Sequence, residues 1–101
     1  MPYRVIFAPE AEEQLLELFD YIANAASPDI ALRYTNALVS YCESFCNFPY
    51  RGNRRDDIRP GLRTTNYRKR TVIAFTVSDA TISIIGIFHG GQNYESQLAD
   101  E

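Results

Sequence analysis

The chain has few of the residue types that bind metals or act as catalytic nucleophiles. Its 101 residues include one histidine, two cysteines, one methionine and no tryptophan. No CxxC pair is present, and the histidine is far in sequence from both cysteines, which argues against a zinc site. The serine hydrolase signature G-x-S-x-G and the zinc protease signature H-E-x-x-H are also missing. We therefore expect no metal site and no cofactor.

Long apolar runs and targeting signals are missing as well. No stretch of 18 apolar residues exists, and no basic-then-apolar leader opens the chain. We therefore expect a cytoplasmic protein with no membrane partner. The hydrophobic share of 46% and the charged share of 23% are those of a globular domain, which we expect to span residues 1–101 as a single unit.

The basic residues are concentrated in one segment. The formal net charge is −3 at pH 7, yet eight of the ten basic residues fall within residues 51–70, between two acidic parts of the chain. This clustering indicates a positive surface for an anionic partner, either nucleic acid or an acidic protein segment. The plainer explanation is a solvated loop and a charged edge strand that resists aggregation. The eight residues are Arg51, Arg54, Arg55, Arg59, Arg63, Arg68, Lys69 and Arg70.

Two amphipathic helices are predicted in the first half of the chain, after a short apolar strand at residues 3–7. Pro9 suits the first turn of a helix whose apolar residues recur at helical spacing until about Asn24. Ser27 is predicted to cap a second helix, which ends at Pro49. Only about three residues separate the helices, so we expect an antiparallel helical hairpin.

Three strands are predicted in the second half, at residues 62–67, 70–77 and 81–88, because these runs are rich in β-branched and aromatic residues. The last two are close enough to form a hairpin. The element order is then β-α-α-β-β-β. The expected fold class is α+β, with an antiparallel sheet packed by the N-terminal helical hairpin.

The last strand is predicted to be apolar on both faces. Simple alternation places Ile82, Ile84 and Phe88 on one face and Ile85 and Ile87 on the other. One helical hairpin covers only one face of a sheet. We therefore expect the second face to remain apolar and rimmed by arginines, as a surface for another protein.

The most plausible catalytic residues lie at the end of the last strand. A metal-independent nuclease needs a base, an acid and cations for the phosphate, and His89, Tyr94 and Arg63 or Arg68 could supply them. The plainer explanation is that His89 hydrogen-bonds backbone and Tyr94 packs as an anchor. The glycines at residues 90–91 lack the Lys-Ser/Thr and the helix start of a phosphate-binding loop.

The two cysteines, Cys42 and Cys46, are one helical turn apart in the predicted second helix. Neighbouring turns of one helix do not offer the Cβ geometry of a disulfide. We therefore expect two free, buried thiols.

Three segments resemble the RelE/ParE superfamily of bacterial type II toxins, and ParE most of all. They are VIFAPEAEEQLLELFDYIA, FPYRGNRRDDIRPGLR and YRKRTVIAFTVSDATISIIGIFHGGQNYE. The resemblance implies a small toxin with a RelE/ParE-like fold that a cognate ParD-like antitoxin neutralises. ParE-like members inhibit DNA gyrase through protein contact, and RelE-like members cleave messenger RNA on the ribosome.

The acidic overall balance and the single lysine favour the gyrase branch, because a ribosome-bound protein gains affinity by neutralising phosphates. We therefore expect no enzymatic activity and no sequence-specific binding of nucleic acid. The first alternative is a RelE-like endoribonuclease that uses His89, Tyr94 and Arg63. The second is a binding module of the same fold without toxicity.

The antitoxin is expected to bind with an acidic amphipathic tail that becomes ordered on the toxin. Positive and aromatic residues in the basic segment and at the C-terminal turn are the expected contacts for antitoxin or target. They are Arg59, Arg63, Arg68, Lys69, Arg70 and Tyr94.

Overall fold

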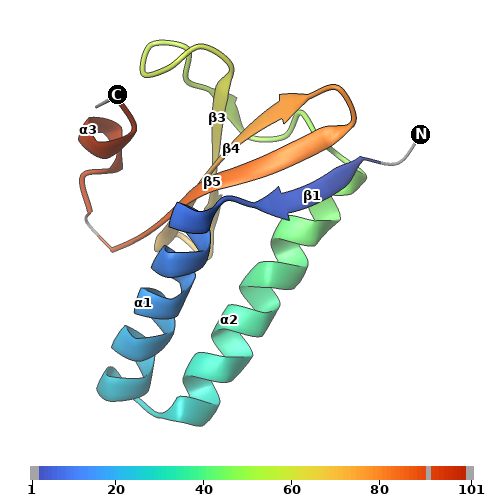
Figure 1. The fold of residues 1–101 in the computed structure, drawn as a ribbon. Coiled ribbons are helices and arrows are strands. Elements are labelled where there is room, and N and C mark those ends of the chain that lie inside the picture. Colours follow the sequence, from blue (N-terminus) through green and yellow to red (C-terminus); the bar gives the residue numbers. More distant parts are fainter. Residues whose placement is uncertain (1–2, 91, 100–101) are drawn as a thin grey trace.

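A computed structural model describes residues 3–90 and 92–99, which form a helical hairpin and a five-stranded sheet (Figure 1). The predicted α+β class and the helical hairpin are confirmed. Within the described residues, no helix combines the length and apolar character needed to cross a bilayer. The elements are β1 (Arg4–Phe7), α1 (Pro9–Ala25), α2 (Pro28–Glu43), the 3-10 helix η1 (Ser44–Cys46), β2 (Asn53–Arg54), β3 (Leu62–Tyr67), β4 (Thr71–Ser78), β5 (Thr81–His89) and α3 (Tyr94–Ala99).

Local signals in the sequence define the helical hairpin. Both helices begin with a proline, and the Ser27 hydroxyl accepts a hydrogen bond from the Ile30 N–H, as predicted for an N-cap. Only Ala26 and Ser27 separate the helices. The predicted end of the second helix is wrong. The helix α2 ends at Glu43, well before Pro49, because the chain changes there from α-helical to 3-10 geometry in η1.

The sheet has the strand order β1-β5-β4-β3-β2. The strands β3, β4 and β5 are antiparallel neighbours, as predicted. The first strand adds a parallel pairing, because β1 lies beside β5, the last strand. The two-residue strand β2, which was not predicted, pairs with β3 at the other edge. The sheet is therefore mostly antiparallel, with one parallel edge.

A β-bulge changes the predicted faces of β5. Ala74 pairs with Gly86 and Phe75 pairs with Ile84, so Ile85 has no partner on β4. One extra residue reverses the alternation beyond it. The prediction that Phe88 shares a face with Ile82 and Ile84 is therefore wrong.

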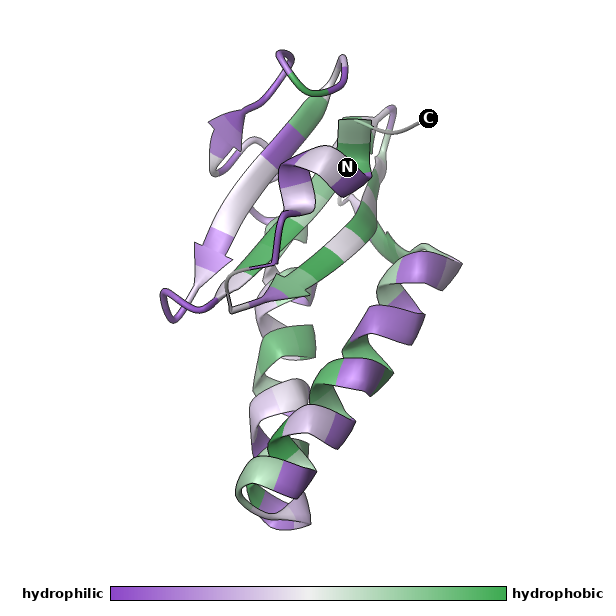
Figure 2. Ribbon diagram, turned by 90° about the vertical axis from the view of Figure 1, so that its left-hand side faces the viewer, coloured by the Kyte–Doolittle hydropathy of each residue, from purple (hydrophilic) through white to green (hydrophobic). Residues whose placement is uncertain are grey.

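The sheet carries one apolar cluster on each face, and Figure 2 shows hydrophobic residues along its central strands. The larger cluster lies between the sheet and the hairpin and contains Leu18, Leu38, Cys42, Phe45, Ile73, Phe75, Ile82, Ile84 and Ile87. The smaller cluster lies on the opposite face and contains Leu62, Ala74, Phe88 and Leu98.

The short helix α3 covers the second face of the sheet. Leu98 is 5% exposed and belongs to the same cluster as Leu62 and Phe88, which are 0% and 3% exposed. Gly86 leaves room for the Phe88 ring, because a Cβ at this position would come within 2.5 Å of it. The expectation of an open apolar face is wrong, since the chain buries it with its own C-terminal segment.

Candidate functional site

The eight basic residues of the segment at 51–70 divide into two groups in the structure. Five of them lie in the loop after η1 or on β2 and β3, and their guanidinium groups contact other parts of the chain. The remaining three, Arg68, Lys69 and Arg70, lie in the β3–β4 turn and are exposed. This turn is named the basic turn below.

Two arginines of the first group hold α3. Arg55 donates to both carboxylate oxygens of Asp57, to the Glu95 carboxylate at 2.7 Å and to the Tyr94 hydroxyl at 3.2 Å. Arg59 donates to the Leu98 carbonyl at 2.8 Å. The Tyr94 ring lies 5.9 Å from the Phe88 ring, centroid to centroid. Among the predicted binding residues, Arg59 and Tyr94 therefore fasten α3 to the sheet.

Arg63, another predicted binding residue, organises the loop after η1. Its guanidinium donates to the carbonyls of Tyr50 and Arg51, at 2.5 and 3.0 Å. It also lies 5.7 Å from the centre of the Tyr50 ring. Arg63 is half-buried, so its first role is to hold this loop against β3.

The basic turn has a backbone that side chains rarely adopt. Arg68 and Lys69 have φ angles of 53° and 65°, in the left-handed region. The Arg68 guanidinium lies 5.2 Å from the centre of the Tyr67 ring, which packs on Tyr34 and Tyr41 of α2. The turn is thus attached to the hairpin through aromatic side chains, and its cations point into solvent.

Replacing Lys69 with glycine is expected to raise the free energy of unfolding by about 0.5–1 kcal/mol, since a left-handed backbone costs an L-residue more than it costs glycine. Chemical denaturation of the purified variant measures the change. Arg70→Gly is the matched control, because Arg70 is not among the described residues with positive φ. Arg70→Gly should lower the free energy of unfolding. An equal increase of this free energy in both variants would contradict the explanation.

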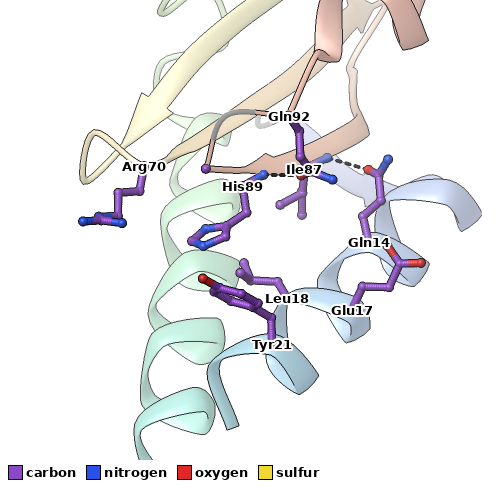
Figure 3. A pocket seen from close by; sticks show the side chains of 9 residues that line it. Gln14, Glu17, Leu18, Tyr21, Arg70, Ile87, His89 and Gln92 are labelled. Atoms are coloured by element: carbon purple, nitrogen blue, oxygen red, sulfur yellow. Dashed lines mark hydrogen bonds between the residues drawn. The ribbon is translucent and has the colours of Figure 1, made fainter. Parts of the chain in front are cut away.

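A pocket of about 390 Å³ lies between α1 and the end of β5 (Figure 3). His89 enters it from the sheet and Tyr21 enters it from α1, with their ring centroids 5.0 Å apart, whereas Arg70 lines its edge and points its guanidinium away from the His89 ring. Glu17 supplies the carboxylate of the lining. Within the described part of the chain, the buried Nδ1 of His89 has no hydrogen-bond partner.

Two glutamines protect the strand edge beside this pocket. The strand β1 ends at Phe7, opposite Ile84, so among the described residues no strand lies beside the rest of β5 on that side. The side-chain carbonyls of Gln14 and Gln92 accept hydrogen bonds from the N–H groups of Ile87 and His89, at 2.7 and 2.6 Å. The side-chain amides thus replace a missing strand.

Desolvation lowers the pKa of His89 from its usual value of 6.5, and the positive charge of Arg70 lowers it further. The unfolded chain then binds a proton more readily than the folded one. The contribution of His89 to stability is therefore complete above about pH 6.5 and is lost as the pH falls toward the folded pKa.

We expect the urea midpoint of the wild type to fall between pH 7.5 and 5.5, and that of His89→Gln to fall less. Because the chain has one histidine, its proton resonances report the pKa directly in an NMR titration. An NMR titration midpoint of His89 above pH 6.5 in the folded protein would contradict this explanation.

The three residues proposed for a nuclease do not meet. His89 faces the hairpin side of the sheet, where it contacts Tyr21, whereas Tyr94 packs on Phe88 on the opposite side. Arg63 pairs with Phe75, which pairs with Ile84, five residues before His89 along β5. At about 3.3 Å per residue, this separation is roughly 16 Å along the strand direction.

The structure instead brings Tyr21 to His89 and places Arg70 at the edge of the same pocket. The sequence gives little indication of this arrangement, because the residues come from separate elements. No group of three or more potential metal ligands occurs among the described residues. Gly90 lies beside the pocket with a φ of 68°, and Gly91 lies outside the described residues.

Both cysteines are free, as predicted, although only Cys42 is fully buried. Burial raises the pKa of Cys42 to about 12. A thiol with this pKa is protonated near neutral pH and does not act as a nucleophile.

Comparisons with known proteins agree with the fold. Residues 5–94 match the sequence model of the family described as "ParE toxin of type II toxin-antitoxin system, parDE". A solved structure described as "Chromosomal ParDE TA system from P. aeruginosa" superposes with a TM-score of 0.76 at 20% sequence identity. The alignment covers 87% of this chain and 96% of the other, and supports the same fold. No curated protein matches the chain.

Proposed function

Since the chain belongs to the ParE toxin family of type II toxin–antitoxin systems, we propose that it arrests growth by binding DNA gyrase and that a ParD-like antitoxin neutralises it. The observation that carries this proposal is the family match over residues 5–94. The separation of His89, Tyr94 and Arg63 adds support, because inhibition by protein contact needs no assembled acid, base and phosphate-binding group.

The basic turn and the adjoining end of α2 form the proposed antitoxin surface. A groove of about 370 Å³ there has an apolar floor of Ile30, Tyr34 and Ala37, flanked by Arg33 and Arg68. An amphipathic acidic segment fits this surface, with apolar side chains on the floor and carboxylates beside the arginines. Lys69 and Arg70 extend the positive rim along the turn.

A supercoiling assay tests the proposed target. Purified toxin is titrated into gyrase, ATP and relaxed plasmid, and loss of supercoiling or accumulation of cleaved DNA is measured on gels. The proposal requires inhibition by the toxin alone and its reversal by the antitoxin encoded beside it. Unchanged supercoiling at a large molar excess of folded toxin would refute the gyrase target.

A RelE-like ribonuclease remains the alternative because one observation favours it: His89 and Tyr21 meet in one pocket, and Arg70 lines its edge. An arginine, an imidazole and a phenol could neutralise a phosphate and transfer protons. Cleavage of messenger RNA in a purified translation mixture, lost in His89→Ala, would support this function. Retained cleavage in Tyr94→Phe would place the reaction in this pocket, away from α3.

A further inference from the structure

The loop after η1 exposes two large aromatic side chains. Phe48 is 66% exposed and Tyr50 is 62% exposed, although most large apolar residues of the chain are buried or half-buried. Single exposed apolar residues are ordinary, but two aromatics within three residues make a concentrated contact surface. We name residues 48–50 the aromatic loop.

The aromatic loop is held in place by its neighbours. Arg63 donates to the Tyr50 and Arg51 carbonyls, and its guanidinium lies near the Tyr50 ring. The neighbouring Tyr50 side chain is the main cause that raises the pKa of Tyr3.

Arg51 anchors the same loop to the hairpin. Its guanidinium lies 4.8 Å from the centre of the Tyr41 ring and 5.0 Å from that of Phe45. The exposed rings therefore project from a backbone that is fixed on both sides. Binding of a partner therefore costs little conformational entropy, because the loop is already ordered before the partner binds.

A cavity of about 290 Å³ adjoins Tyr50, with Arg54 and Asp56 on its rim and Val77 in its lining. Arg54 and Asp56 form an ion pair at 2.7 Å, so this rim carries both signs of charge. Aromatic rings on a fixed backbone, an arginine and an adjacent cavity are features of the residues that dominate binding energy at interfaces between folded proteins.

We propose that the aromatic loop is the surface with which the toxin binds its protein target, and that it is distinct from the antitoxin surface. The partner it fits is a folded protein with an apolar pocket for Phe48 and Tyr50. The basic turn fits an acidic, flexible segment and lies at the opposite end of β3, roughly 16 Å from Arg63 by strand geometry. This inference rests on the proposed function, in that the toxin acts by protein contact.

The test compares the wild type, the double variant Phe48→Ser/Tyr50→Ser and the control Leu16→Ser. Leu16 is 67% exposed on α1, which matches the exposure of the aromatic pair. Growth arrest on induction, inhibition of supercoiling and binding of the neighbouring antitoxin are measured for each. Retained antitoxin binding shows that a variant is folded.

The double variant is expected to lose growth arrest and to need at least about tenfold more protein for half-inhibition of gyrase, with antitoxin affinity unchanged. Leu16→Ser should behave as the wild type. Equal growth arrest by the wild type and the double variant would overturn this inference and leave the proposed function standing. Growth arrest without gyrase inhibition refutes the gyrase target, and its loss in the double variant then still supports the aromatic loop. A wild-type protein that does not arrest growth would overturn both this inference and the proposed function.

Discussion

Reversing the charges of Arg68 and Lys69 together is expected to weaken antitoxin binding by roughly 30- to 150-fold at low ionic strength. Both side chains are exposed on the basic turn. Each reversal replaces attraction to a carboxylate with repulsion, and two such changes amount to about 2–3 kcal/mol. Because the charges are exposed, the loss should shrink at 0.3 M salt.

Titration calorimetry at low and high salt measures this effect on the purified double variant Arg68→Glu/Lys69→Glu. Arg4→Glu is the matched control, because Arg4 is exposed on β1, at the opposite edge of the sheet from β2 and β3. It should change the affinity by less than about threefold. Unchanged affinity of the double variant at low salt would show that the basic turn does not bind the antitoxin.

Arg70→Glu examined alone separates the two sides of the turn. Arg70 lines the pocket with His89, whereas Arg68 lines the groove on α2. An antitoxin confined to the groove on α2 should tolerate the change at Arg70 better than the change at Arg68. A larger loss from Arg70→Glu would place the acidic segment over the His89 pocket instead.

Replacing Phe75 with alanine is expected to lower the free energy of unfolding by about 3–5 kcal/mol, which is a large part of the total for a domain of this size. Phe75 lies on β4, is 0% exposed, and its ring centroid is 4.8 Å from that of Phe45. This pair joins the sheet to the chain just after α2. Its loss leaves a cavity where the hairpin meets the sheet.

Urea denaturation followed by circular dichroism measures the loss. Phe48→Ala makes the same chemical change at an exposed position and should cost less than about 0.5 kcal/mol. Similar midpoints for the two variants would mean that the large cluster does not hold the hairpin to the sheet. The comparison also establishes whether variants of the aromatic loop remain folded.

The local elements were predictable because their signals are local. Ser27 and Pro28 start a helix through contacts within one turn, and the helical repeat of apolar residues reports which side is buried. The β4–β5 hairpin likewise follows from two apolar runs and a short connection. These features require no knowledge of distant residues.

The bulge at Ile85 and the helix α3 were not predictable by the same reasoning. An unpaired residue on β5 becomes visible only in the register with β4, and it moves Phe88 to the face opposite Ile84. The segment that forms α3 is too short to be a stable helix alone. It depends on Leu98 packing against the sheet and on Arg55 and Arg59.

The amino-acid sequence alone therefore determined the order of the main elements, the fold class, the family resemblance and the position of the positive charge along the chain. Only the tertiary structure decided how that charge is used: Arg55, Arg59 and Arg63 hold α3 and a loop, while Arg68, Lys69 and Arg70 stay exposed. It also brought Tyr21 to His89. The physical reason is that helix and turn signals act over a few residues, whereas the partner of a side chain depends on register and packing between distant segments.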